Sequence, residues 1–213
     1  WGHDTDIVPL LNVLKKYNVK GTFFVRVGTA STPLDTPFSN PNLLRKIALD
    51  GHDIGSHTFT HMTVDINDED EKAKLEADVK AAYDEMYRYI GDTGRLTLYF
   101  RPPTLAVSKL GMETVFNLGH SYIVNGDFST HDYEAKSKQE LADKLLNGFD
   151  ILTEAPADLS TPSDKVRRIS SGSIIVMHMS ENAKYTAEAL DTAIPFYMNL
   201  GYRFAKLSDY LKD

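Results

Sequence analysis

The chain has 213 residues, and its 23 basic against 30 acidic side chains give a formal net charge of −7. An apolar fraction of 42% with 25% charged residues excludes a disordered or collagen-like chain. The acidic balance argues against nucleic-acid binding, because neutralising phosphates needs a basic surface. The longest apolar run, residues 174–177, is far below the roughly 18 residues of a membrane span. The absence of cysteine excludes disulfides, thiolate metal ligands and a cysteine nucleophile.

Predicted helices and strands alternate along the chain. Helical periodicity and short β-branched or aromatic runs predict, in order, a helix over 6–17, a strand over 21–25, a helix over 41–49, a strand over 53–56, a helix over 69–90, a strand over 97–100, a helix over 109–118, a strand over 122–124, a helix over 139–149, a loop over 155–171, a strand over 173–177, a helix over 186–200 and a strand over 202–206. This order indicates parallel βα units in one α/β domain over residues 1–213, either a barrel or a doubly wound sheet. A helix comes first where the alternation requires a strand, so we expect the first strand to be missing from this sequence.

Two histidines follow the predicted strand over 53–56, in the segment Ser56-His57-Thr58-Phe59-Thr60-His61. Imidazoles four residues apart can bind one metal ion from a helix face or from a tight loop. Such a pair is more often a surface or capping feature. Its place just past a strand end favours a site, because α/β barrels put their sites there.

Three further strand ends carry polar residues. Arg101 precedes two prolines, Asp127 and Asp132 follow the strand over 122–124, and His178 follows the most apolar strand. Each has an ordinary alternative reading: a surface arginine, loop aspartates and a hydrogen-bonded core histidine. Taken together with the histidine pair, they form an ordered set of motifs.

That set resembles the polysaccharide deacetylases of carbohydrate esterase family 4, the NodB-homology group. The family's (S/T)HxxxH pair, RxP turn, DxxDW-like segment and final LxH correspond in order to residues 56–61, 101–103, 132–133 and 177–178. The resemblance covers essentially the whole chain. It implies a distorted (β/α) TIM-like barrel and a metal-dependent hydrolase. The expected reaction removes acetyl groups from peptidoglycan or chitin-like glycans that contain N-acetylglucosamine, or from O-acetylated xylan.

The resemblance also implies roles for individual residues. His57 and His61 would bind Zn²⁺, or another divalent transition metal such as Co²⁺. Arg101 would orient the catalytic base, and Asp132 would tune His178, the general acid. The expected substrate-binding residues are Pro103, Thr104 and Tyr133. Zinc suits the chemistry, because it polarises the poorly electrophilic amide carbonyl and lowers the pKa of bound water to about 7. A carboxylate then removes the proton from that water, and a protonated histidine supplies one to the leaving amine.

The sequence departs from the family pattern at its start. The acidic first motif, which supplies the base and the third metal ligand, is expected upstream of Trp1, and His3, Asp4 and Asp6 are the only local substitutes. Asp6 is better interpreted as a charge favoured by a helix N-terminus. The family often has Tyr at the position of Thr104 and Trp at that of Tyr133. Asp127 is the alternative to Asp132 as the tuning aspartate.

Two other functions stay open: a catalytically inactive, glycan-binding member of this fold, and a related metal amidohydrolase acting on small cyclic amides. Phe59, Tyr99 and Tyr133 could stack on sugar faces, or could simply pack in the core or rim. We expect a monomer whose partner is an acetylated polysaccharide. By family resemblance it would act outside a bacterial cell or at its surface.

Overall fold

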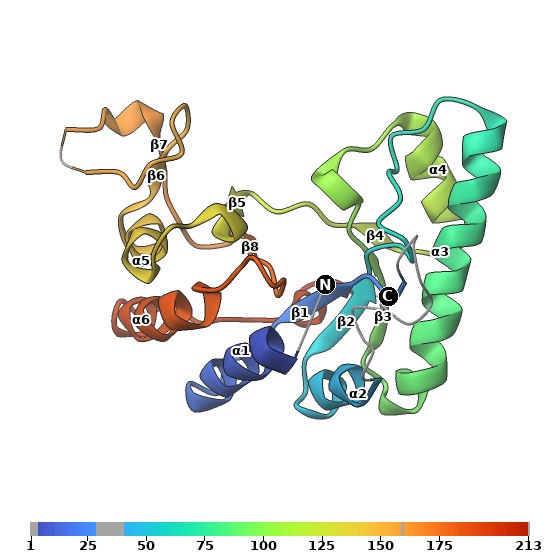
Figure 1. Ribbon diagram of the computed structural model, residues 1–213, viewed down its shortest axis with the longest axis horizontal. Coiled ribbons are helices and arrows are strands. Elements are labelled where there is room, and N and C mark those ends of the chain that lie inside the picture. Colours follow the sequence, from blue (N-terminus) through green and yellow to red (C-terminus); the bar gives the residue numbers. More distant parts are fainter. Residues whose placement is uncertain (1–3, 29–40, 159, 213) are drawn as a thin grey trace. The chain divides into compact units, whose positions relative to one another are not determined.

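The computed structural model describes residues 4–28, 41–158 and 160–212 (Figure 1). The helices are α1 (Asp4–Lys16), α2 (Pro41–Leu49), α3 (Glu69–Ile90), α4 (Lys109–Asn117), α5 (Lys138–Asn147) and α6 (Thr186–Asn199). The strands are β1 (Thr22–Val25), β2 (Asp53–Ser56), β3 (Leu96–Phe100), β4 (Tyr122–Ile123), β5 (Phe128–Ser129), β6 (Phe149–Asp150), β7 (Val166–Arg167) and β8 (Ile175–Val176). No helix in the described ranges has both the length and the apolarity to cross a membrane.

The chain divides into two compact units. The first unit is built from Lys20–Asn125 and the segment that begins at Ala205, and the second from Gly126–Phe204 and the segment that ends at Val19. The first unit therefore contains the strands β1 to β4 with α2, α3 and α4. The second contains α1, α5 and α6 with the strands β5 to β8 (Figure 1).

A four-stranded parallel sheet in the order β1-β2-β3-β4 forms the centre of the first unit. Its register aligns the strand ends, because Val25 pairs with Ser56, Ser56 with Phe100, and Phe100 with Ile123. All four residues of β2 are buried, as expected for an inner strand of a parallel sheet. The residues that follow these strands consequently emerge at one edge of the sheet.

Helix α3 covers this sheet with an apolar face and begins at a well-formed cap. The Asp68 side chain accepts a hydrogen bond from the Glu71 amide at 2.8 Å, and acidic residues fill the first turn. Leu75 and Val79 lie one turn apart and are buried in a cluster with residues of β3 and α4. The cluster comprises Val64, Ile66, Leu75, Val79, Phe100 and Val115.

The second unit has its own core between α5, α6 and β5. Its buried members are Phe128, Leu141, Ala142, Leu145, Ala189 and Ala193. Strand β5 pairs in parallel with β8, and β6 pairs antiparallel with β7. Tyr197 of α6 donates its hydroxyl to the Leu145 carbonyl at 2.6 Å, which ties α6 to α5. The β5–β8 pair brings residues 128–132 beside residues 175–178.

The structure corrects three predictions of local structure. Residues 202–206 form no strand: the Tyr202 amide bonds to the Tyr197 carbonyl, and the Lys206 amide to the Asp209 carboxylate, so these donors do not join a ladder. The predicted loop over 155–171 contains β7, and the predicted helix over 139–149 ends at Asn147. Gly148 allows that ending, because its φ of 85° is accessible to glycine.

Of the three substitutes considered for the missing first motif, His3 lies outside the described residues. The side chains of Asp4 and Asp6 lie outside them too, although the backbone of both belongs to α1.

Candidate functional site

The two histidines of the His57–His61 pair lie close together at the carboxyl edge of the parallel sheet. Their ring centroids are 5.0 Å apart and the ring planes are inclined at 76°. The His57 amide donates to the Val25 carbonyl at 3.0 Å, which continues the β1–β2 ladder by one residue. This hydrogen bond fixes the position of the His57 backbone. The pair is therefore positioned by the sheet.

His57 has the protonation pattern of a metal ligand. Its Nδ1 lies 2.7 Å from the Arg101 carbonyl oxygen, and a carbonyl can only accept, so Nδ1 carries the proton. The lone pair is then on Nε2. Burial lowers the pKa of His57 from 6.5 to about 3, which keeps the ring neutral at physiological pH. A neutral imidazole whose other nitrogen bonds to a backbone carbonyl is the usual form of a metal-bound histidine.

Two buried hydroxyls belong to the sequence neighbours of His57. Ser56 Oγ and Thr58 Oγ1 are both buried with no hydrogen-bond partner within the described part of the chain. Unpaired buried hydroxyls are uncommon and have capacity for a further partner. The residues present therefore fit a metal ion, although no third histidine or carboxylate joins His57 and His61 among the residues described.

Arg101 directly follows β3 and lies beside His57 through the sheet register. Its amide donates to the Ser56 carbonyl at 2.9 Å, and its Nε donates to the Val124 carbonyl at 3.0 Å. The guanidinium carbon stacks 4.4 Å from the centre of the Phe24 ring. Burial lowers the pKa of Arg101 to about 10, so the side chain stays cationic at neutral pH. It is a fixed positive charge at the strand end.

Asp132 and His178 form a tight pair in the second unit. Asp132 Oδ1 lies 2.7 Å from His178 Nδ1, and Oδ2 accepts the His178 amide at 2.8 Å. Oδ2 also accepts the Thr186 hydroxyl at 2.6 Å. Asp132 is fully buried, whereas the His178 side chain is 41% exposed. The three donors stabilise the buried carboxylate, and His178 presents Nε2 away from it.

The alternative tuning residue, Asp127, has a different partner. Its carboxylate accepts the Ile174 amide at 2.5 Å and so closes the turn that leads into β8. Asp132 is thus the aspartate that contacts His178.

The expected substrate-binding residues have unlike environments. Tyr133 is 39% exposed, and its ring meets the His178 ring edge-on at 4.8 Å. Pro103 is buried, whereas Thr104 is exposed and has a left-handed φ of 60°. Tyr99 is 1% exposed and donates its hydroxyl to the Leu211 carbonyl, so it packs in the core as the alternative interpretation held.

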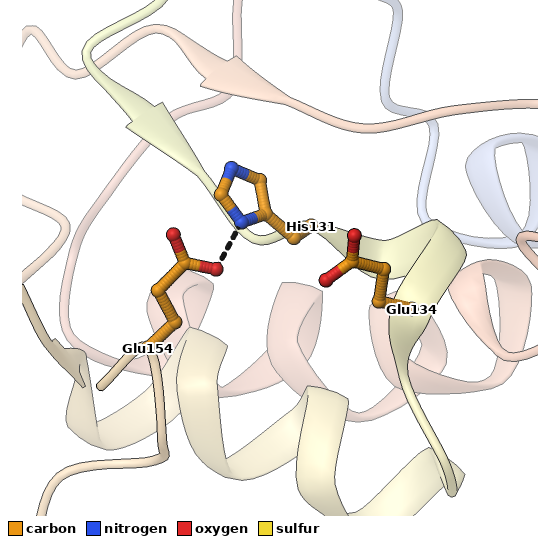
Figure 2. A group of neighbouring side chains, drawn as sticks. All are labelled: His131, Glu134 and Glu154. Atoms are coloured by element: carbon orange, nitrogen blue, oxygen red, sulfur yellow. Dashed lines mark hydrogen bonds and ion pairs between the residues drawn. The ribbon is translucent and has the colours of Figure 1, made fainter. Parts of the chain in front are cut away.

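A second group of metal-ligating side chains lies in the second unit and was not predicted from the sequence. His131, Glu134 and Glu154 place one ligand atom each within 4.8 Å of one another (Figure 2). His131 Nδ1 is hydrogen-bonded to the Glu154 carboxylate, so each of these two groups already has a partner. His131 precedes Asp132 directly, which is a sequence signal, but Glu154 is 23 residues away and only the fold brings it near.

Comparison with known proteins places the chain in a family. A sequence model described as "Polysaccharide deacetylase" matches residues 2–123, more than half of the chain. An uncharacterised 30.6 kDa protein of Geobacillus stearothermophilus is 27% identical, with 96% of this chain and 65% of that protein aligned. The peptidoglycan-N-acetylmuramic acid deacetylase PdaA of Bacillus subtilis is 26% identical, with 99% and 68% aligned. The chain thus spans about two thirds of the length of these two relatives.

A solved structure confirms the predicted fold class. The family 4 acetyl xylan esterase of Clostridium thermocellum, solved with a cobalt ion, superposes with a TM-score of 0.72 at 24% identity, over 98% of this chain and 85% of that one. The α/β fold of the distorted-barrel type is therefore confirmed. The family prediction made from the ordered motifs is confirmed as well: the chain belongs to the polysaccharide deacetylase family, carbohydrate esterase family 4.

Proposed function

We propose that the chain hydrolyses acetyl groups on a polysaccharide and does so with a divalent metal held by His57 and His61. Peptidoglycan or a chitin-like glycan is the proposed substrate, because the PdaA relative is named for its action on peptidoglycan. O-acetylated xylan is the next candidate. The proposed site of action is the bacterial cell surface or its surroundings, with Zn²⁺ as the first metal to test and a monomer as the proposed state.

One observation carries the catalytic part of this proposal: the buried Asp132 contacts His178 at both its ring and its amide. This pairing fixes the ring orientation and leaves Nε2 able to deliver a proton. A surface histidine would not need such a support. The assignment of His57, His61 and His178 to one reaction rests on the order of their motifs along the chain, which is that of the family.

The reaction divides between named residues. When bound, the metal would polarise the acetyl carbonyl and make water a stronger nucleophile. Oxygen of water adds to the carbonyl carbon, its proton goes to a base, and the C–N bond then breaks. His178 Nε2 gives its proton to the departing amine, so that acetate and a free amine result. Arg101 contributes a fixed positive charge that orients the base.

The test combines metal content with acetate release from N-acetylated chitin oligomers, peptidoglycan and acetylated xylan. Wild type should hold about one equivalent of Zn²⁺. His57→Ala should lose both metal and turnover, whereas His178→Ala should keep the metal and lose turnover. His131→Gln is the control, because it removes an imidazole that does not belong to the His57–His61 pair. This variant should retain the metal. Normal acetate release by His178→Ala would overturn its role as the acid.

The alternatives give different results in the same assays. An inactive glycan-binding protein would bind the oligomers without releasing acetate. A metal amidohydrolase of another substrate class would hold the metal and hydrolyse a small cyclic amide in preference to every acetylated glycan.

A further inference from the structure

The loop that joins His57 to His61 has an unusual backbone. Thr58 has a φ of 63° and His61 a φ of 65°, both in the left-handed region. For a β-branched residue such as threonine this conformation is unfavourable, and it persists only where the surroundings enforce it. Some other part of the chain must therefore hold residues 58–61 in place.

Asp78, on helix α3, makes the contacts that do so. One of its carboxylate oxygens accepts the Phe59 amide at 2.6 Å. The other accepts the Thr60 amide at 3.1 Å and the Thr60 hydroxyl at 2.5 Å. These donors lie between the two left-handed residues. A single carboxylate thus binds the middle of the loop at three points.

Strand β1 and the residues that follow it also contact the loop. The Phe59 carbonyl accepts the Gly28 amide at 2.7 Å, and a Cβ at Gly28 would come within 2.1 Å of the Phe59 ring. The His57 amide is fixed on β1. Backbone contacts therefore hold the start of the loop, and Asp78 is the charged acceptor that holds the turn leading to His61.

We propose that Asp78 is a positioning residue that holds the His57–His61 loop in its metal-binding conformation. This inference rests on the proposed function, in which both histidines bind the metal. Asp78 acts through the backbone and touches neither imidazole in the contacts described. An asparagine at this position would offer one accepting oxygen instead of two, so at least one loop donor would lose its partner.

The chain offers a matched control on the same helix. Asp84 is exposed, so Asp84→Asn removes the same charge from α3 without touching the loop. Asp78→Asn should weaken Zn²⁺ or Co²⁺ binding about 10- to 100-fold, the usual effect of losing a group that orients a ligand. Asp84→Asn should bind like wild type. The absorption spectrum of the Co²⁺ form should change in Asp78→Asn alone, and Asp78→Glu, which keeps both oxygens, should recover part of the affinity.

Amide hydrogen exchange of the metal-free chain supplies a readout that does not involve the metal. The amides of Phe59 and Thr60 should exchange faster in Asp78→Asn, while those of β2 and α3 keep their protection. If Asp78→Asn does not fold, Thr60→Val removes only the hydroxyl contact and should weaken metal binding in the same direction, by less.

The outcomes separate this inference from the proposed function. If wild type binds metal, His57→Ala abolishes binding and Asp78→Asn matches wild type in affinity and exchange, the role of Asp78 is wrong and the proposed function stands. If wild type takes up no metal, the proposed function is wrong, and the metal-positioning role of Asp78 is overturned with it.

Discussion

Asp132 holds His178 at two points, because one carboxylate oxygen lies 2.7 Å from the ring Nδ1 and the other accepts the backbone amide at 2.8 Å. The carboxylate is fully buried and the imidazole is partly exposed. The pair therefore joins a buried carboxylate to a ring that solvent can reach, which is the arrangement that the proposed general acid requires.

Asp132→Asn should reduce acetate release by about 10²- to 10⁴-fold, the range that general acid catalysis supplies. The amide nitrogen that this substitution places beside Nδ1 would favour the tautomer of His178 that has its proton on Nε2 and its lone pair on Nδ1. The imidazolium form of His178 would also lose its negatively charged partner. Steady-state kinetics on a chitin oligomer measures the change, with metal content unaltered. Asp127→Asn, which affects only the Ile174 contact, should retain most of the activity. Equal losses in both variants would argue against a specific role for Asp132.

Thr186→Val should lower both stability and turnover. The variant keeps the side-chain shape but removes the hydroxyl that donates to Asp132 at 2.6 Å, leaving the buried carboxylate with two donors. A hydrogen bond to a charged group contributes about 1.5–3 kcal/mol, and urea unfolding should show a loss of that size. Thr192→Val on the same helix removes only a long contact of 3.4 Å to the Glu188 carbonyl, and it should unfold like wild type.

Replacing Glu134 and Glu154 together by glutamine should leave about one equivalent of metal bound. The reason is that His131 Nδ1 is already hydrogen-bonded to the Glu154 carboxylate, whereas His57 presents a free lone pair on Nε2. Elemental mass spectrometry after metal loading measures this. Loss of the metal in this variant, with retention in His57→Ala, would place the ion on the His131 group instead.

His52 should make the protein less stable as the pH falls. Burial, and next the nearby Lys20, lower its pKa to about 4, and its Nδ1 accepts the Gly21 amide at 3.1 Å. Between pH 6.5 and 4 the unfolded chain binds a proton that the folded chain does not, so the free energy of unfolding decreases over that window. A shift of this size corresponds to about 3 kcal/mol.

The comparison for His52 is His52→Asn, whose side-chain oxygen can still accept the Gly21 amide but does not titrate. Urea unfolding at intervals from pH 7 to 4 should show a shallower decline for this variant. Parallel curves for the two proteins would mean that His52 does not contribute.

Much of the fold could be predicted from the sequence, because its signals are local. The apolar spacing of Leu75 and Val79 with a cap at Asp68 defines α3, and the β-branched and aromatic run of residues 22–25 defines β1. The predicted strand over 202–206 was wrong, because apolar and aromatic residues there resemble a strand while their amides bond to a helix end and to a carboxylate.

For the site, the sequence by itself determined the family and the candidate residues. The reason is that the motifs are defined by residue types and by their order along the chain, and both can be read without a structure. Only the tertiary structure decided how they are supported: that Asp132 and not Asp127 contacts His178, that the Arg101 carbonyl fixes the tautomer of His57, and that Asp78 binds the loop between the histidines. These contacts join residues that are 19 to 46 positions apart. A hydrogen bond requires a distance of about 3 Å between its two heavy atoms. The sheet register and the helix packing bring these residues to that distance, and their spacing along the sequence does not predict it.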